Sequence, residues 1–183
     1  IDDKRSLDFI AQRGYRSGGV GINAATAQSY TFDAEFTWNY ELSLRTQWLD
    51  DRLTVNANAF FTDWTDQQVN VQLSANTFDS ETQNAGASEV TGFEIEAQYE
   101  ATGDLDIYGS IGVAESEFTD FCATVQLQNT DGLQTCEING ATGFDFSGNT
   151  FTNAPDLTLA GGFTWQNDNW IVNGNANYAS ASF

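Results

Sequence analysis

The sequence predicts an all-β chain, a section of an antiparallel transmembrane β-barrel that contributes about seven strands. Three observations predict this fold class. Apolar and polar residues alternate through long segments, which is the two-residue period of a strand with one apolar face. Short turns and long connections follow each other along the chain. Aromatic residues flank the short turns, and outer-membrane barrels combine this girdle with short turns at one end and long loops at the other.

The first predicted element is a weakly patterned strand over Leu7–Tyr15, followed by a Gly-, Ala- and Ser-rich connection over residues 16–37. In the next segment, Trp38–Trp48, mostly apolar side chains occupy the even positions and polar ones the odd positions. The turn-like residues 49–52 lead into Leu53–Trp64, which has the same alternation. The two segments therefore predict a hairpin whose strands have matched faces.

The second strand of this hairpin is expected to continue through residues 66–72, before a polar loop over 74–81. The next two wall strands are predicted over Asn84–Tyr99 and Leu105–Val113. A second short turn at residues 101–104 joins them, and its Gly and Asp residues are typical of tight turns.

The longest connection, Asp120–Asn153, precedes the last predicted hairpin. This hairpin consists of Leu157–Trp165 and Val172–Tyr178, joined by a third short turn at residues 166–169. Seven strands are too few to close a bacterial barrel, which has an even number of strands and at least about eight. The sequence is therefore expected to be a section of a larger barrel.

The chain has two cysteines, Cys122 and Cys136, and both lie in the longest connection. We expect them to form a disulfide in an oxidising compartment, with a pair of free thiols as the alternative. In the chain-entropy model, closing a loop of this size stabilises the fold by about 3 kcal/mol.

Strand length favours lipid over a second sheet as the partner of the apolar face. Trp38–Trp48 spans ten residue steps, which at about 3.3 Å per residue and a tilt of about 40° gives a height of about 25 Å. This height equals the thickness of the apolar band of an outer-membrane barrel, and a tryptophan lies at each end of the segment. The alternative is a long hairpin in a soluble β-sandwich.

Charge and composition exclude several classes of function. The 26 acidic and 6 basic residues give a net charge of −20, and no lysine or arginine follows Arg52. Binding to nucleic acid needs clustered cations, so no nucleic-acid partner is expected. Histidine is absent, which removes Ser-His-Asp and Cys-His catalysis and the commonest transition-metal ligand. We therefore expect no enzyme, no cofactor and no metal site.

Residues 129–132 resemble the middle of a calcium-binding loop, but the pattern lacks acidic residues at Leu127 and Ile138. A dedicated calcium site is therefore not expected. No apolar run of 18 residues occurs, so no transmembrane helix is predicted. The chain opens on Ile1 and an Asp-Asp-Lys-Arg run, which suggests a processed or partial chain.

Several motifs, in their order and spacing along the whole chain, resemble the TonB-dependent outer-membrane receptors. The similarity rests on Arg13–Gly19, Asn39–Arg45, Ala59–Trp64, Asn84–Gly86, Gly92–Glu96 and Gly148–Pro155. The resemblance implies a 22-stranded barrel, closed by a plug domain, that imports scarce nutrients such as ferric siderophores at the expense of inner-membrane energy. It places residues 1–183 within one C-terminal barrel domain, with the plug and the final strands outside this sequence.

The resemblance also implies partners and a location. The partners are outer-membrane lipid, a nutrient ligand such as a ferric siderophore, and an inner-membrane energy-coupling protein that acts through the plug. The location is the outer membrane of a Gram-negative cell, with the long loops extracellular.

Two sets of residues are candidates for function. Charged residues that would face the lumen are Glu41, Arg45, Glu94 and Glu96. They either contact a plug or are ordinary solvated wall positions. Candidates for ligand binding in the long loops are Arg16, Tyr30, Phe32, Phe78 and Phe121. Aromatic rings and a cation could hold an anionic or catecholate-bearing iron complex by stacking and charge, or these residues could serve loop packing or an interfacial girdle.

Two other functions remain open at this point. A passive porin or sugar channel would share the lipid-facing pattern but would lack a plug. A secreted β-sandwich adhesin or lectin would be soluble without detergent.

Overall fold

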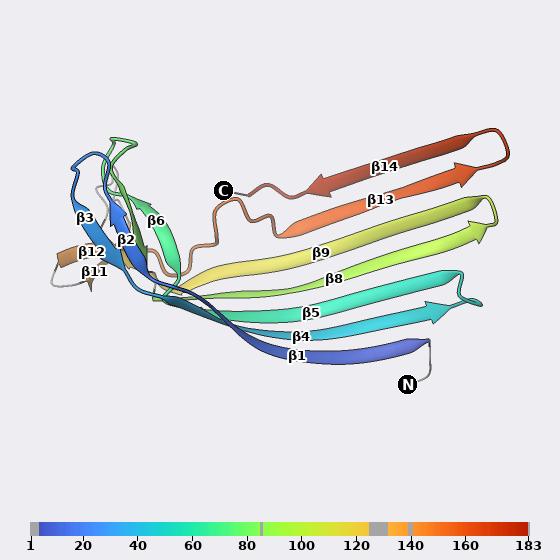
Figure 1. Ribbon diagram of the computed structural model, residues 1–183, viewed down its shortest axis with the longest axis horizontal. Helices are drawn as coiled ribbons and strands as arrows, with labels where there is room; N and C mark the ends of the chain where they lie inside the picture. The colour runs from blue at the N-terminus through green and yellow to red at the C-terminus, as the bar shows by residue number, and fades with distance from the viewer. Residues whose placement is uncertain (1–3, 85, 125–131, 139–140, 183) are drawn as a thin grey trace.

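A computed structural model of the chain describes residues 4–84, 86–124, 132–138 and 141–182. Its main feature is one sheet of seven antiparallel strands, each paired with the next wall strand along the chain (Figure 1). These strands are β1 (Arg5–Arg16), β4 (Glu35–Trp48), β5 (Leu53–Thr65), β8 (Ala87–Thr102), β9 (Leu105–Asp120), β13 (Leu157–Gln166) and β14 (Ile171–Ala179). The predicted all-β antiparallel fold is confirmed, and the sheet is open, with β1 and β14 at its edges.

The wall strands extend further toward the long loops than the apolar pattern indicated. β9 contains 16 residues, whereas the predicted strand ended at Val113. The extension is paired with β8, and Glu115 and Glu117 lie opposite Thr91 and Glu89. The backbone ladder therefore continues where the side chains cease to be apolar.

The expected continuation of the second hairpin strand through residue 72 is wrong. β5 ends at Thr65, and Asp66 has a φ of 55°, which turns the chain out of the sheet. Residues 68–72 form a separate strand, β6 (Gln68–Gln72), which pairs with β7 (Ser80–Asn84) in a sheet of its own. The predicted strand over Asn84–Tyr99 consequently begins later, at Ala87.

The register aligns the apolar residues of neighbouring strands on one face. Leu42 lies opposite Ala59, Ala59 opposite Phe93, and Phe93 opposite Val113. The same face holds a stack of aromatic rings in which Tyr40 contacts Trp38 and Phe61, with ring centroids 6.1 and 6.4 Å apart. The opposite face holds most of the polar side chains of these strands.

No second sheet covers the apolar face among the described residues. Leu42 is 47% exposed, and Leu44, Ile95 and Ile107 are exposed to a similar degree. A soluble β-sandwich would bury these side chains under an opposing layer. The structure therefore contradicts the sandwich alternative and agrees with a wall whose apolar face contacts lipid.

Arginine side chains lie over aromatic rings near both ends of the apolar face. The guanidinium of Arg5 lies 4.3 Å from the ring centroid of Trp48, close to the first short turn. At the end of the sheet that carries the long loops, the guanidinium of Arg13 lies 4.8 Å from the ring centroid of Phe36. Such pairs suit a membrane interface, because the apolar stem of an arginine side chain can contact lipid tails while its charged guanidinium reaches the hydrated headgroups.

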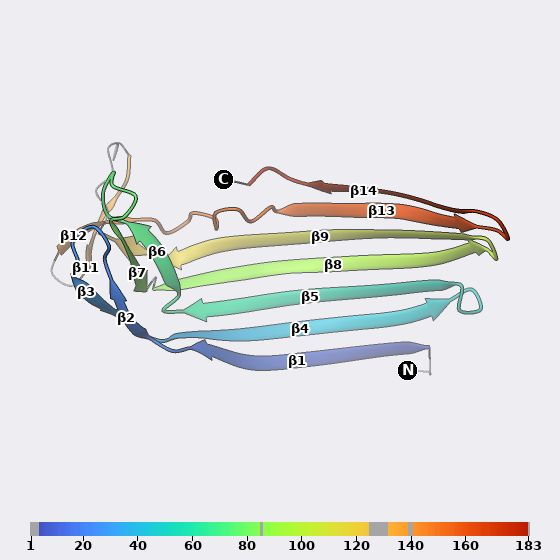
Figure 2. The same cartoon turned by 45° about the horizontal axis from the view of Figure 1, so that its top comes forward.

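Small strands of the long connections gather at one end of the sheet, and the short turns lie at the other end (Figures 1 and 2). They are β2 (Gly19–Ile22), β3 (Ser29–Phe32), β6, β7, β10 (Cys122–Ala123), β11 (Thr135–Ile138) and β12 (Ala141–Asp145). The pairs β2–β3 and β6–β7 form two-stranded sheets, and β10, β12 and β11 form a third sheet. The predicted sorting of connections by length is thus confirmed.

The predicted disulfide between Cys122 and Cys136 is present, with a Cα–Cα distance of 6.0 Å. It joins β10 to β11, which both pair with β12. Within the described residues, no helix has the length and hydropathy to cross a membrane. The calcium-loop-like residues Asn129, Thr130 and Asp131 lie outside the described residues.

Candidate functional site

The polar face of the sheet forms a hollow of about 430 Å³ in its middle. Arg45 on β4, Asn56 on β5, and Glu94 and Glu96 on β8 contribute to its lining. The Asn56 amide donates a hydrogen bond of 2.6 Å to Glu96, whereas Glu41 accepts one from Ser43. Three of the four predicted lumen residues therefore meet at one hollow, and their contact with a plug stays a prediction.

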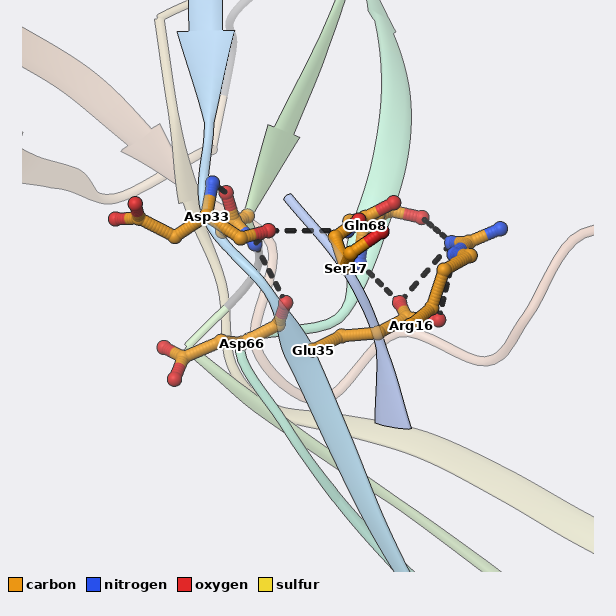
Figure 3. A network of polar contacts seen from close by, with 7 residues as sticks. Arg16, Ser17, Asp33, Glu35, Asp66 and Gln68 are labelled. Carbon is orange, nitrogen blue, oxygen red and sulfur yellow. Dashed lines mark hydrogen bonds and ion pairs between the residues drawn. The ribbon is translucent and has the colours of Figure 1, made fainter. Parts of the chain in front are cut away.

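A polar network fixes the base of the loops where they leave the sheet (Figure 3). Arg16 at the end of β1 forms an ion pair of 2.8 Å with Glu35 at the start of β4, and Glu35 is 5% exposed. The Gln68 backbone N–H donates to the same carboxylate at 2.7 Å. The Gln68 amide also donates to the carbonyls of Ser17 and Asp33, each at 3.0 Å. This network joins the connection 17–34 to the connection 66–86.

A second contact joins the outer parts of the same two connections. Asn23 is 1% exposed, and its amide donates to Asp79 at 2.8 Å and to Glu81 at 3.2 Å. Hydrogen bonds from Ser74 and from Asn23 lower the pKa of Asp79 below its ordinary value of 3.8. The two connections are therefore tied together at the base and further out.

An open pocket of about 600 Å³ lies between β6 and the end of β9 with the segment that follows it. Its apolar lining residues are Val69, Val71, Phe118, Phe121, Ala123, Phe146 and Phe151. Phe118 lies at the centre of the ring contacts, 4.9 Å from Phe121 and 4.8 Å from Phe151 between ring centroids. A pocket of this size and composition is suited to an apolar part of a small ligand.

The disulfide-linked sheet supplies one wall of this pocket. Phe121 and Ala123 flank Cys122, and Phe146 follows β12. Gly143 allows the close approach of β12 to β10, because a Cβ at this position would lie 2.8 Å from the Ala123 carbonyl oxygen. Among the described residues, no group of three His, Cys, Asp or Glu side chains is arranged to hold a metal ion.

The structure does not bring the five predicted ligand-binding residues together. Arg16 belongs to the network with Glu35, so its charge is already paired. Tyr30 and Phe32 contact each other on β3 at a centroid distance of 6.3 Å, and Phe78 is 68% exposed in the β6–β7 connection. Phe121 lines the pocket and is 9% exposed. The role of these side chains in ligand binding stays a prediction.

Sequence reasoning missed most of the pocket. Phe118, Phe146 and Phe151 line it, but only Phe121 was singled out. One signal was present, because five of the fourteen phenylalanines fall between residues 118 and 151. No such signal marks β6, because its pocket-lining residues lie at least 46 positions before those of this segment.

A one-layered antiparallel sheet with an apolar outer face, a polar inner face and loops sorted by length is the wall of a transmembrane β-barrel. The chain belongs to the TonB dependent receptor-like β-barrel family, whose family model matches residues 8–183. This family is one of outer-membrane transport receptors of Gram-negative bacteria and not of enzymes.

Solved structures of receptors and transporters share this fold. The ferric yersiniabactin uptake receptor FyuA of Yersinia pestis matches 97% of this chain at 21% identity, with a TM-score of 0.65. The alcaligin outer-membrane receptor FauA of Bordetella pertussis matches 98% at 17% identity, with a TM-score of 0.57. The copper transporter OprC matches 97% at 14% identity, with a TM-score of 0.66. The chain spans 23%, 27% and 24% of these three proteins, respectively.

Proposed function

We propose that this chain is part of the barrel wall of an outer-membrane receptor that imports a scarce nutrient by energy-coupled transport, with a ferric siderophore complex as its cargo. The observation that carries this proposal is the family match over residues 8–183 on a one-layered sheet with opposite apolar and polar faces. FyuA, with the same fold, is an uptake receptor for a ferric siderophore. OprC transports copper on this fold, so the cargo needs a test of its own.

In this proposal, residues 1–183 belong to one C-terminal barrel domain whose lumen holds a plug from elsewhere in the full-length receptor. The long loops are extracellular and capture the cargo, and the short turns are periplasmic. An inner-membrane energy-coupling protein acts on the plug, and the cargo passes after the plug changes conformation. The hollow lined by Arg45, Glu94 and Glu96 offers the plug both signs of charge at one place. No covalent chemistry takes place.

Uptake of radioactive iron by cells that express the full-length receptor tests the proposal. With a ferric siderophore as the iron source, we expect saturable uptake that stops when an uncoupler collapses the inner-membrane proton gradient. Uptake that continues without the gradient would identify a passive channel. Energy-dependent uptake of copper without uptake of iron would show that the transport mode is right and the cargo wrong.

A further inference from the structure

The pocket beside β6 differs in its chemistry from a site for an anionic ligand. Its described walls come from residues 67–72, 118–123 and 146–152, and the whole chain after Arg52 contains no lysine or arginine. Acidic residues do occur close to these walls in the sequence, among them Asp66, Asp120 and Asp145. An anionic group that entered this pocket would therefore meet a field of its own sign.

The nearest candidate for a compensating cation is already paired. Arg16 reaches the Gln68 carbonyl oxygen at 3.4 Å, beside the first residues of β6. Its guanidinium, however, contacts both carboxylate oxygens of the buried Glu35, at 2.8 and 3.0 Å. The positive charge at this edge of the pocket is thereby neutralised.

Two of the three side-chain amides of the lining form hydrogen bonds within the protein, and the third, Asn70, lies at an exposed position. Gln67 accepts a hydrogen bond of 2.6 Å from the buried Ser88 hydroxyl. The Gln72 amide donates to the backbone carbonyls of Ser74 and Asn76, at 2.9 and 2.7 Å. The Thr152 hydroxyl, at an exposed position of the lining, makes no hydrogen bond to a described residue. The pocket thus offers aromatic and aliphatic surface with few polar groups.

From this combination we infer that the pocket binds an uncharged, ring-bearing part of the imported ligand, and that the anionic part of any ligand is held outside these two loop segments. The inference rests on the proposed function as a nutrient receptor and specifies the ligand chemistry of one site. The four phenylalanine rings provide stacking surface for an aromatic group, and the volume of about 600 Å³ is sufficient for a fragment of a small molecule. Binding there buries apolar area without the cost of removing a charge from water.

Three ferric chelates separate the contribution of the ring from that of charge. The iron(III) tris-benzohydroxamate complex is neutral and carries phenyl rings, the tris-acetohydroxamate complex is neutral and carries methyl groups, and the tris-catecholate complex carries rings and negative charge. Their affinities for the purified full-length receptor are measured by equilibrium binding of radioactive iron. We expect the benzohydroxamate complex to bind at least about tenfold more tightly than either of the other two.

Variants of the lining test whether the preference for the benzohydroxamate complex comes from this pocket. Phe121→Ala removes a ring from the lining, and Thr152→Trp obstructs the pocket from an exposed position without removing its packing. Each is expected to weaken binding of the benzohydroxamate complex by about tenfold or more, while the acetohydroxamate complex changes by less than about twofold. Phe144→Ala is the matched control, because Phe144 lies on β12 in the same small sheet but does not line the pocket.

Equal affinity for the phenyl and methyl complexes, tighter binding of the tris-catecholate complex, or equal effects of Phe121→Ala and Phe144→Ala would each overturn the inference. If no ferric chelate binds, these chelates do not represent the cargo, and the uptake experiment decides whether the cargo is a ferric siderophore. The comparison is then made with uncomplexed benzohydroxamic and acetohydroxamic acids, detected by saturation-transfer NMR. For a receptor with another cargo, we still expect a stronger saturation-transfer signal from benzohydroxamic acid than from acetohydroxamic acid, and we expect Phe121→Ala to remove this difference. Equal signals from the two acids would overturn the inference.

Discussion

Replacing Ile95 with arginine is expected to destabilise the folded receptor by about 2–4 kcal/mol, because the new cation would lie in hydrocarbon. Ile95 is on the apolar face of β8, paired with Ala57 and Ile111, and is 39% exposed with no protein layer above it. It lies four residues from Tyr99 and six from Glu89, which are on the same face in the rows of Trp48 and Trp38. At about 3.4 Å per residue and a tilt of about 40°, it lies roughly 10 Å from one limit and about 16 Å from the other, near the bilayer midplane.

Glu94→Arg provides the matched control. Glu94 is the preceding residue at the same depth, but its side chain lies on the polar face and helps to line the hollow of about 430 Å³. An arginine there faces water, so the free energy of unfolding is expected to change by less than about 1 kcal/mol. The two variants introduce the same side chain within one residue of each other and differ in the face that receives it.

Urea titration of the full-length receptor in phospholipid vesicles measures this difference, with the folded fraction read from the heat-modifiable mobility of the barrel on gels. A loss of 2–4 kcal/mol corresponds to roughly a 30- to 700-fold shift of the folding equilibrium. If Ile95→Arg proved as harmless as Glu94→Arg, the apolar face would not contact lipid. If Glu94→Arg were the more damaging variant, the assignment of the two faces would be reversed.

Four other perturbations test the loops and the wall. Asn23→Asp replaces a buried donor by a third carboxylate, and we expect at least about tenfold faster amide exchange in β2, β3, β6 and β7. In the natural protein, hydrogen bonds lower the pKa of Asp79 when folded, so this contact is expected to stabilise the loops above pH 3.8 and to weaken as the pH falls further, as followed by amide exchange at stepwise lower pH. Replacing both cysteines by serine should destabilise the β10–β12 region by about 3 kcal/mol, seen as faster limited proteolysis while the gel mobility of the barrel is unchanged. Gly92→Ala should cost about 1–3 kcal/mol in urea titration, because its Cβ would lie 2.5 Å from a backbone oxygen of β9, whereas Gly109→Ala, at 3.6 Å from the nearest atom, should be accommodated.

The wall strands were predictable because the information that specifies them is local. In Trp38–Trp48 the alternation of side chains gives both the strand and its apolar face without reference to any partner. The disulfide was predictable for a similarly simple reason, since the chain offers a single pairing. Asp66 shows where local reading fails. Val69 and Val71 keep the odd positions of the apolar residues before it, which predicts one continuous strand. The positive φ of Asp66 nevertheless turns the backbone away from the sheet, and aspartate is among the residues that adopt this conformation most readily.

The candidate site was less predictable, because its contacts join segments far apart in the sequence. Arg16 looked like a free cation for an anionic ligand, yet the β1–β4 register places it directly opposite Glu35. The pocket forms because β6 approaches the segment that contains Phe118 and Phe121. Neither segment carries a sequence pattern that indicates contact with the other. Hairpin pairing extends from a turn that can be recognised, whereas contacts between loops depend on how several hairpins are arranged in space.

The charges on the outer face define how deep the wall lies in the membrane. Trp38 lies opposite Asp63, Asp63 opposite Glu89, and Glu89 opposite Glu117, so three carboxylates share one row across neighbouring strands. Like charges that lie directly opposite each other repel, and carboxylates in hydrocarbon are costly, so this row has to lie in the hydrated headgroup layer. Trp48 lies ten residues along β4 from Trp38, about 26 Å lower at a tilt of about 40°. Between these two levels, the outer face of β4 and of its neighbours β1 and β5 carries only three kinds of side chain. They are apolar side chains, threonine, and an arginine that is paired with an aromatic ring. The same register that pairs the strands therefore sets the thickness of membrane that the wall can span.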